Sequence, residues 1–371
     1  MKKINVVKIC YTGGGTGGHI FPIFAVDKAL SLLLKGENYT FTRQFIGRID
    51  SKEQFWVEKE GIPYYAIHSG KLRRYFSIQN FFDVFKVISA FFQALYFLQR
   101  EKPLILFSKG GFVSVPVVIA AYFLRIPIIA HDSDATPGLA NRIAIHVAST
   151  MCVSDQEVIS HFPKRFQHKC VVTGVPSRLN REEYIQRHRY PRPLILFLGG
   201  SLGAQQINNL VTEIKDELLQ IGSIIHQTGY NKGEYHSSSG YEVFSFIEDE
   251  YIDILYNVDI VVSRGGATAL ADFIEMEVPS VLIPLGKNAS RGDQVLNAAK
   301  GEKLGISIVL QSETVTSKEL LYTVENLLND KEALLLMKGN LRKLKNKRGQ
   351  TIIASIILDT VLKKNDNIKK I

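Results

Sequence analysis

The chain has 371 residues, of which 46% are hydrophobic and 22% are charged, and its formal net charge is +9. Such a composition excludes an intrinsically disordered chain, and the length allows two α/β domains of ordinary size. The positive charge favours an anionic partner, either a phosphorylated ligand or an anionic membrane surface. Nucleic acid is disfavoured, because the sequence has no basic block interleaved with aromatic residues.

Three scattered cysteines, Cys10, Cys152 and Cys170, have neither the number nor the spacing of a disulfide framework or a metal-ligand set. The N-terminal residues lack the apolar segment of a signal peptide. We also find no apolar run of the about 18 to 20 residues that a membrane-spanning helix needs. These features predict a cytoplasmic protein that is soluble or peripherally bound to a membrane.

Strand-like apolar runs alternate with helix-like segments along the whole chain. Several runs are apolar throughout, as expected of parallel strands covered on both faces. This alternation predicts an α/β fold with two doubly wound parallel sheets, whose ligands bind beyond the carboxyl ends of the strands, in a cleft between the domains. The expected strands are 4–11, 40–46, 104–107, 126–130 and 148–153 in the first half, and 193–198, 222–226, 242–246, 258–262 and 280–284 in the second.

A stretch rich in Arg, Glu, Tyr and Pro, residues 176–193, separates the two series of strands. It predicts an N-terminal domain at 1–175 and a C-terminal domain at 176–371, both Rossmann-like. The last helix could pack back on the N-terminal domain.

The first strand runs into a glycine loop, Thr12–His19, and then into a helix-like segment. This order is typical of a phosphate-binding turn, because glycines allow a close backbone approach and the helix presents its free N–H groups. Two nucleotide classes are disfavoured. The next strand ends at Gly47 and Arg48 rather than at the acidic residue of a dinucleotide site, and the loop lacks the Gly-Lys-Ser/Thr ending of a nucleoside triphosphatase.

Small residues also follow three later strands, at 108–116, 199–201 and 263–272. Four such loops, two in each half, are hard to explain as plain turns. The last is the most specific, because small residues at a helix start bind a diphosphate through N–H groups and hydroxyls. Asp272, one to two turns into that helix, could accept hydrogen bonds from both hydroxyls of a ribose. The alternative is a charge favoured there by the helix dipole.

The motifs that contain these loops resemble, in order and spacing, those of the MurG family of UDP-GlcNAc-dependent glycosyltransferases. The resemblance implies the GT-B fold, a C-terminal domain that binds UDP-GlcNAc, and an N-terminal domain that binds the acceptor and the membrane. The implied inverting reaction moves GlcNAc to the 4-hydroxyl of MurNAc in lipid I, the undecaprenyl-diphosphate-linked MurNAc-pentapeptide. It yields lipid II for peptidoglycan at the cytoplasmic face of the membrane. The motifs are 14–19, 108–114, 137–142, 174–178, 199–204 and 293–298.

Two positions depart from the family pattern. Asp272 stands where the family usually has a ribose-binding Glu, and Asp134 stands where an Asn often contacts the sugar. An added negative charge beside a diphosphate is unfavourable unless it is neutralised. The substrate-binding positions implied by the resemblance are Thr16, Gly17, Gly18, Asp134, Asn141, Arg178, Ser201, Ile247, Ala267, Thr268, Ala269, Leu270, Asp272 and Gln294.

An inverting transfer needs a base for the acceptor hydroxyl and stabilisation of the departing UDP. His19 is our candidate base, because imidazole titrates near neutral pH. Asp134 and His131 are alternatives, and a structural role at the helix start is the other interpretation of His19. Arg178, Ser201 and helix N–H groups would stabilise the leaving group. No cofactor is expected. Residues 131–134 could chelate a cation, but a loop with two carboxylates is more often solvated or structural, so a metal ion is not expected as a required part of the site.

Residues 76–98 contain seven Phe and only two charged side chains, Asp83 and Lys86, with cations on both sides of the segment. An apolar helix with flanking cations is typical of a peripheral anchor on anionic lipid. A core helix of the first domain fits the same residues. Both interpretations hold if one face is buried and the other is exposed.

Two other functions remain open. A GT-B glycolipid glycosyltransferase that adds sugar to diacylglycerol would share the donor site and differ in the first-domain loops. A non-catalytic sugar-nucleotide-binding membrane protein would keep the fold and lose the chemistry. The segments Thr12–His19 and 137–142 favour the MurG-type enzyme over the first. The second is disfavoured by the presence of His19, Arg178, Ser201 and Gln294, although Asp134 leaves it some room.

Overall fold

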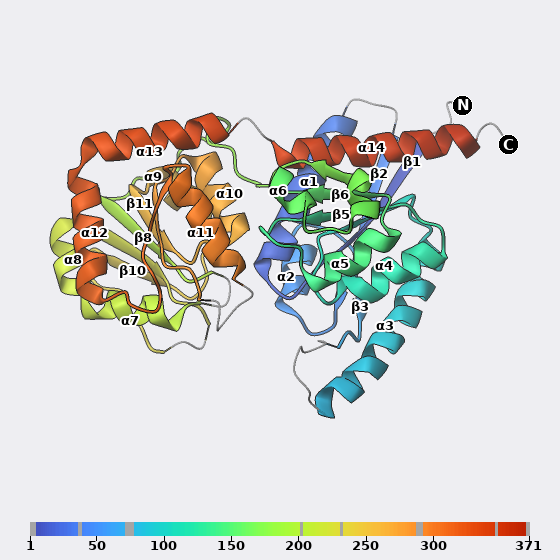
Figure 1. Cartoon of the computed structure of the whole chain (residues 1–371), viewed down its shortest axis with the longest axis horizontal. Coiled ribbons are helices and arrows are strands. Elements are labelled where there is room, and N and C mark those ends of the chain that lie inside the picture. The colour runs from blue at the N-terminus through green and yellow to red at the C-terminus, as the bar shows by residue number, and fades with distance from the viewer. Residues whose placement is uncertain are drawn as a thin grey trace. The chain divides into compact units, whose positions relative to one another are not determined.

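Figure 1 shows a computed structural model of the chain, which describes residues 5–35, 39–70, 78–200, 203–230, 233–286, 292–345 and 348–368. The chain divides into two compact units. Unit 1 is Met1–Arg178 together with Arg348–Ile371, and unit 2 is Leu179–Lys347. Each unit is built on one parallel sheet.

The sheet of unit 1 has seven strands in the order β3-β2-β1-β4-β5-β6-β7, all parallel. The strands are β1 (Asn5–Thr12), β2 (Tyr39–Arg48), β3 (Tyr64–Ile67), β4 (Ile105–Ser108), β5 (Ile128–Asp132), β6 (Thr150–Val153) and β7 (Cys170–Val172). The helices are α1 (Gly17–Leu34), α2 (Lys52–Lys59), α3 (Ile78–Glu101), α4 (Ser114–Phe123), α5 (Leu139–Val147), α6 (Gln156–Ile159), a 3-10 helix (Lys164–Lys169) and α14 (Gly349–Ile368).

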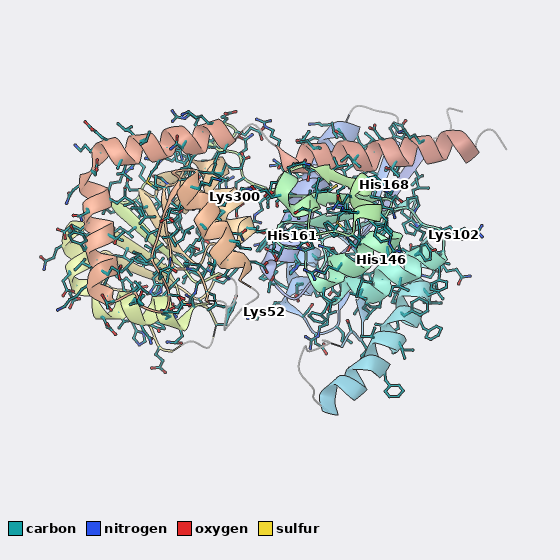
Figure 2. All side chains as sticks on the ribbon, viewed as in Figure 1. Lys52, Lys102, His146, His161, His168 and Lys300 are labelled. Carbon is teal, nitrogen blue, oxygen red and sulfur yellow. The ribbon has the colours of Figure 1, made fainter. Side chains whose placement is uncertain are left out.

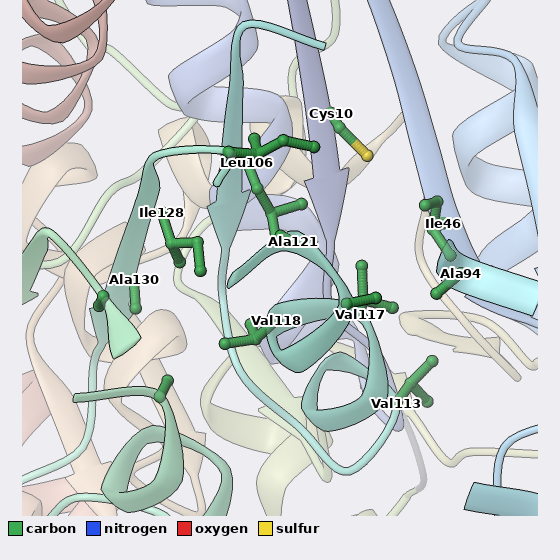
Figure 3. Packing of buried hydrophobic residues seen from close by; sticks show 14 of the residues in the cluster. Cys10, Ile46, Ala94, Leu106, Val113, Val117, Val118, Ala121, Ile128 and Ala130 are labelled. Atoms are coloured by element: carbon green, nitrogen blue, oxygen red, sulfur yellow. The ribbon is translucent and has the colours of Figure 1, made fainter. Parts of the chain in front are cut away.

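One face of this sheet is covered by α3, α4 and α5. Figure 3 shows side chains of α4 packed against β1, β4 and β5, with Cys10, Leu106 and Ile128 among the strand residues. Cys10 is the small buried residue of a core strand, and burial raises the pKa of its thiol. These side chains are apolar because strands covered by helices expose neither face to water.

The C-terminal helix α14 belongs to unit 1, where it packs on α1 (Figure 1). Its buried residues Ile353, Ile357 and Val361 recur every four positions and so form one helical stripe. At its start, the backbone N–H of Ser177 contacts the side-chain oxygen of Gln350 at 3.4 Å.

Helix α1 corrects one expectation. It is long and apolar enough, by length and composition, to cross a membrane, and the sequence analysis had found no such run. More than half of it, 56%, is buried inside the protein, as in a core helix. Its buried Asp27 accepts a hydrogen bond from Tyr11 Oη at 2.9 Å and forms an ion pair with Arg43 of β2.

The sheet of unit 2 has six parallel strands in the order β10-β9-β8-β11-β12-β13, with an apolar core on each face. The strands are β8 (Leu194–Leu198), β9 (Ser223–Gln227), β10 (Tyr241–Phe244), β11 (Ile260–Ser263), β12 (Ser280–Leu282) and β13 (Ser307–Val309). The helices are α7 (Gln205–Glu213), α8 (Lys215–Ile221), α9 (Tyr251–Asn257), α10 (Ala267–Met276), α11 (Asp293–Lys303), α12 (Ser317–Asn329) and α13 (Lys331–Leu344).

The predicted α/β class and the predicted strands are confirmed, and three strands were missed. These are β3, β7 and β13, which have three or four residues each and lie at sheet edges. Both sheets reverse their strand order once, between β1 and β4 in unit 1 and between β8 and β11 in unit 2. Ligands of open α/β sheets bind at such switch points, beyond the carboxyl ends of the strands. The four predicted glycine loops are the loops that follow these four strands.

Candidate functional site

At the switch point of unit 1, the loops after β1 and β4 touch. The backbone N–H of Lys109 donates to the Thr12 carbonyl at 2.9 Å. Gly111 has a φ of +85°, and a Cβ placed there would lie 2.1 Å from the carbonyl oxygen of Gly14. Only glycine fits such an approach, so this residue locks the two loops together.

The loop after β1 leads directly into α1. Thr16 is the N-cap residue of the helix, and Gly17 and Gly18 open its first turn. His19 donates its backbone N–H to the Thr16 carbonyl at 3.0 Å, and its ring Nδ1 lies 3.0 Å from Thr16 Oγ1. This contact between the Thr16 hydroxyl and Nδ1 holds the His19 imidazole in one orientation. The exposed Gly15 donates its backbone N–H to Glu53 of α2 at 2.7 Å, which fixes the loop just before the helix.

Arg178 lies beside the same helix. Its guanidinium carbon stands 4.6 Å from the centre of the Phe21 ring, within the range of a cation–π contact. The loop that carries Arg178 is itself fixed to β5, because His131 Nε2 lies 2.9 Å from the Gly174 carbonyl. Unit 1 thus brings Thr16, His19 and Arg178 to the start of one helix.

The carboxylate of Asp132 organises the loop after β5. It accepts hydrogen bonds from the backbone N–H of Asp134 (3.0 Å), the backbone N–H of Gly138 (3.0 Å) and the side chain of Asn141 (2.9 Å). Asn141 also donates to the His131 carbonyl at 3.0 Å and packs against Gly110. Asp134 and Asn141, both candidate contacts, therefore belong to one polar network, in which Asn141 has a structural role.

His131 is fully buried at the end of β5. Burial and the nearby cation of Lys109 lower its pKa well below the ordinary value, so the imidazole is neutral. Because Nε2 faces a carbonyl, that nitrogen carries the proton, and Nδ1 has no hydrogen-bond partner. Two more buried atoms of this network, Ser133 Oγ and Asn141 Oδ1, also lack a partner.

Lys109 carries a cation into this network and was given no role by the sequence analysis. The residue is 3% exposed. Burial lowers the pKa of its amine, whereas the carboxylates of Asp132 and Asp134 act in the opposite direction. The sequence placed Lys109 inside a recognised motif, but nothing in that motif indicated a buried charge.

In unit 2, the loop after β11 opens helix α10. Gly266 is its N-cap residue, and Ala267, Thr268 and Ala269 form its first turn, with the N–H of Leu270 bonded to the Gly266 carbonyl at 3.0 Å. The first N–H groups of a helix have no acceptor within it and attract anions. Asp272, one turn further along, lies 3.4 Å from the hydroxyl of Tyr251.

Gln227, at the end of β9, joins two other loops. Its side chain accepts the backbone N–H of Ile247 at 2.9 Å and donates to the Gly200 carbonyl at 3.0 Å. Ile247 is buried in the core, so its backbone is rigidly held. Ser201 lies outside the described residues. The bridging Gln227 was missed by the sequence analysis, which had no signal for it beyond a polar residue at a strand end.

Two further side chains fix the neighbouring segments. Gln294, the second residue of α11, accepts the backbone N–H of Leu285 at 2.8 Å. Arg264 donates to the side chain of Gln206 at 2.9 Å and to the Ile283 carbonyl at 3.1 Å. Burial lowers the pKa of this guanidinium. Arg264, to which the sequence analysis gave no role, thus fixes the loop that precedes α10.

Among the residues that the structure describes, no cluster of three His, Cys, Asp or Glu side chains has the arrangement of a metal site. The described residues of each unit nevertheless gather backbone N–H groups, hydroxyls and cations at a switch point. Two Rossmann-like sheets with such sites have the architecture of the GT-B fold class, which includes nucleotide-sugar glycosyltransferases.

Comparison with known proteins supports this fold class. Residues 9–153 match the glycosyltransferase family 28 N-terminal domain, and residues 194–352 match the family 28 C-terminal domain. In structure, the chain is similar to MurG of Acinetobacter baumannii, with a TM-score of 0.69 and 23% identity over 95% of this chain and 99% of that one. It is also similar to UDP-GlcNAc 2-epimerase of Neisseria meningitidis, with a TM-score of 0.64 and 13% identity over 95% and 100%. These two likenesses concern the fold.

Sequence relatives identify the family more narrowly. A UDP-N-acetylglucosamine--N-acetylmuramyl-(pentapeptide) pyrophosphoryl-undecaprenol N-acetylglucosamine transferase of Clostridium botulinum is 41% identical over 94% of this chain and 98% of its own length. A second transferase of that name, from Bacillus cereus, is 43% identical over 94% and 99%. The chain belongs to glycosyltransferase family 28 and, within it, to the MurG-type N-acetylglucosaminyltransferases, as the motifs had indicated.

Proposed function

We propose that this chain transfers GlcNAc from UDP-GlcNAc to the 4-hydroxyl of MurNAc in lipid I and so produces lipid II. The observation that carries the proposal is the near full-length identity to transferases whose names state this donor sugar and this acceptor. The alternative, transfer to diacylglycerol, has no comparable support in the sequence of the first unit.

The donor is assigned to the C-terminal domain, residues 176–371. The first turn of α10, from Ala267 to Leu270, would bind the diphosphate through its N–H groups, with Gln294 and Ser201 beside it. Asp272 would hold the ribose hydroxyls. Since the Ile247 N–H is already bonded to Gln227, a contact with the uracil edge would use the carbonyl oxygen of Ile247.

His19 is assigned as the base, in the N-terminal domain, residues 1–175, which would bind the acceptor. For Nε2 to accept the proton of the sugar hydroxyl, Nδ1 must be protonated and donate to Thr16 Oγ1, and their 3.0 Å separation allows this. His131 is a weaker candidate, since its low pKa makes it a poor base and it is fully buried. Gly17, Gly18 and Arg178 would face the anionic parts of the substrates.

A transfer assay tests the reaction. Purified protein with labelled UDP-GlcNAc should label a lipid I analogue and leave diacylglycerol unlabelled. Binding of UDP-GlcNAc without transfer to either lipid would favour a non-catalytic protein. Label in diacylglycerol would identify the glycolipid enzyme.

The assignment of His19 has its own test. His19→Ala should lower kcat by about two to four orders of magnitude, the usual contribution of a general base. Thr16→Val should lower it less and shift the pH profile, because the imidazole loses its orienting partner. His168→Ala, which changes an exposed histidine of unit 1 that Figure 2 labels, is the matched control and should keep full activity. Near-normal turnover of His19→Ala would exclude it as the base.

We also propose that unit 1 binds an anionic membrane surface through α3. The buried residues Ala90, Ala94 and Leu98 face the core, and the opposite side of the helix is an aromatic stripe. The first half of α3 extends beyond the rest of unit 1 in Figure 1. The stripe consists of Phe85 (57% exposed), Ile88 (48%), Phe92 (61%) and Tyr96 (60%). Residues 71–77, with the expected flanking cations Lys71, Arg73 and Arg74, lie outside the described residues.

The stripe continues onto the end of α4. The rings of Phe91 and Phe123 meet edge to face at 5.7 Å, and Tyr122 and Phe123 are both exposed. The exposed cations Lys86, Lys102 and Arg125 lie on the same helices or just after them. Exposed aromatic groups next to cations are the composition of a peripheral anchor on anionic lipid.

Vesicle sedimentation tests this surface. Phe85→Ser/Phe92→Ser should weaken binding to anionic vesicles by about tenfold or more, because two apolar side chains no longer leave water. Leu335→Ser/Leu336→Ser is the matched control, since these leucines of α13 are equally exposed, at 70% and 65%. Equal losses in both double variants would remove α3 as the anchor.

A further inference from the structure

We propose that Phe21 is a positioning residue for Arg178. The face of its ring holds the guanidinium in place, so that the guanidinium N–H groups can bind a substrate diphosphate. The inference rests on the proposed function, because both UDP-GlcNAc and lipid I carry a diphosphate. The family resemblance implies a substrate contact for Arg178 and gives Phe21 no role. Both residues belong to unit 1.

The backbone that leads to Arg178 is anchored inside unit 1. The carbonyl of Gly174 lies 2.9 Å from Nε2 of the buried His131. The backbone N–H of Ser177 contacts the side-chain oxygen of Gln350, in α14, at 3.4 Å. The side chain of Arg178 therefore starts from a fixed point of the chain.

The ring of Phe21 fixes the other end of this side chain. The guanidinium carbon lies 4.6 Å from the ring centre, and both residues are half-buried. A cation is attracted by the negative face of an aromatic ring, and more strongly where water is excluded. The partner is a ring face and not a hydrogen-bond acceptor, so the N–H donors of Arg178 can still pair with an anion. Among the residues that the structure describes, no carboxylate neutralises this guanidinium.

The ring of Phe21 is itself held by two neighbours. It lies 5.2 Å from the ring of Trp56, in α2, and 6.1 Å from the ring of Phe24, one turn further along α1. Trp56 is 9% exposed and Phe24 is 6% exposed, so neither can move away easily. The ring is therefore a preorganised support, which fixes the orientation of Arg178 before any substrate binds.

The start of helix α1 favours an anion at the same place. Phe21 lies one turn after Gly17, and helical side chains lean toward the N-terminus of their helix, so its ring carries Arg178 toward the first turn. That turn contains no acidic residue, and the positive end of the helix dipole attracts anions. The nearby carboxylate of Glu53 accepts the N–H of Gly15, which precedes the helix. A diphosphate suits this combination, because arginine pairs strongly with phosphate through two parallel hydrogen bonds.

Calorimetric titration with UDP-GlcNAc and, separately, with a lipid I analogue tests the role of Phe21 without using the transfer reaction. Arg178→Ala should raise the dissociation constant of one of these ligands by about tenfold or more, because charged hydrogen bonds are lost. Phe21→Leu should raise the same dissociation constant by about three- to tenfold, and Phe21→Tyr, which keeps the ring face, by less than about twofold. A loss for UDP-GlcNAc assigns the diphosphate to the donor, and a loss for the lipid I analogue assigns it to the acceptor.

A double-variant cycle separates positioning from a structural role. If the ring acts through the guanidinium, Phe21→Leu/Arg178→Ala should bind as Arg178→Ala alone does. Phe166→Leu is the matched control, because it takes the ring from Arg165, whose guanidinium lies at the same 4.6 Å in the same unit. This control should bind both ligands normally. Thermal unfolding reports whether each variant folds, and Phe21→Met, which has no ring, replaces Phe21→Leu if that variant does not.

Unchanged affinity for both ligands in folded Phe21→Leu would overturn the proposal. So would an equal loss of affinity from Phe21→Leu with and without Arg178, since the ring would then act independently of the guanidinium. A Phe21→Tyr variant as weak as Phe21→Leu would also contradict it. Absence of transfer to lipid I by the unmodified protein would instead contradict the proposed function, because the binding measurements do not need the reaction.

Discussion

The two switch points use the same loop architecture and differ in how their polar groups are satisfied. In unit 2, His226 has a partner on each ring nitrogen, Tyr241 at 2.8 Å and Asn208 at 3.1 Å, and Gln227 bridges two loops. In unit 1, the equally buried His131 has one partner and an unpaired Nδ1. The closed network of unit 2 indicates a preformed frame that presents its backbone to a ligand. The open network of unit 1 indicates polar side-chain atoms that are left for a ligand to pair with.

The largest expected effect tests what the two units share. In unit 2, a Cβ on Gly203 (φ +73°) would lie 2.4 Å from the Thr228 carbonyl oxygen, much as a Cβ on Gly111 would meet Gly14. Gly111→Ala and Gly203→Ala should each lose about 3 kcal/mol or more of unfolding free energy, from the clash and the strained φ together. Urea unfolding measures both. A small loss of unfolding free energy in one variant would show that its loop can relax, and that the two loops are not equally constrained.

The pH dependence of unit 2 comes next. Burial lowers the pKa of His226 from 6.5 to about 4, so the imidazole stays neutral in the folded protein at neutral pH. The contribution of neutral His226 to the free energy of unfolding is complete above pH 6.5. It is lost as the pH falls toward 4, because the unfolded chain binds the proton at a higher pH than the folded protein does. The difference amounts to about 3 kcal/mol.

His226→Gln should flatten the stability curve between pH 6.5 and 4 by up to that amount. Denaturant unfolding at several pH values provides the measurement. The remaining slope includes His131, whose pKa is lowered in the same direction. Identical slopes in the variant and the unmodified protein would contradict the assignment of a neutral, buried His226.

A smaller effect is expected from opening the closed network. Gln227→Ala leaves the Ile247 N–H and the Gly200 carbonyl without their partner, at a cost of about 1 to 3 kcal/mol. We expect weaker binding of UDP as well, measured by calorimetry. Gln205→Ala is the control, because the exposed Gln205 bonds mainly to Asn209 one turn away. If UDP affinity is unchanged, the bridge serves stability alone.

The smallest effect separates backbone strain from steric clash. A Cβ on Gly200 (φ +74°) would meet nothing within 4 Å, and neither would one on Gly266, whose φ is −64°. Gly200→Ala should therefore cost about 1 kcal/mol from conformation alone, and Gly266→Ala should cost only the difference between Gly and Ala at an N-cap position, with no strain and no clash. Thermal unfolding compares them. A large loss in Gly266→Ala would indicate a clash that the described backbone does not contain.

The sequence predicted the alternating elements and the four glycine loops, because apolar runs and glycines are local signals. It missed β3, β7 and β13, since three or four residues at an edge are too short for a hydrophobic pattern. It quoted Lys109 and assigned it nothing, because burial of a lysine depends on neighbours such as Asp134 that are distant in sequence. The contact of Arg178 with Phe21 joins residues more than 150 positions apart, and no local pattern reports it.

The placement of α14 has a consequence for synthesis. Unit 2 is inserted between the two segments of unit 1, so the second segment, Arg348–Ile371, is translated after unit 2. On the ribosome, unit 2 can complete its sheet while α1 still lacks the helix that covers it. Helix α1 is the most apolar long helix of the described chain. Its exposed face is then the surface that a chaperone or a nearby bilayer would meet before α14 emerges.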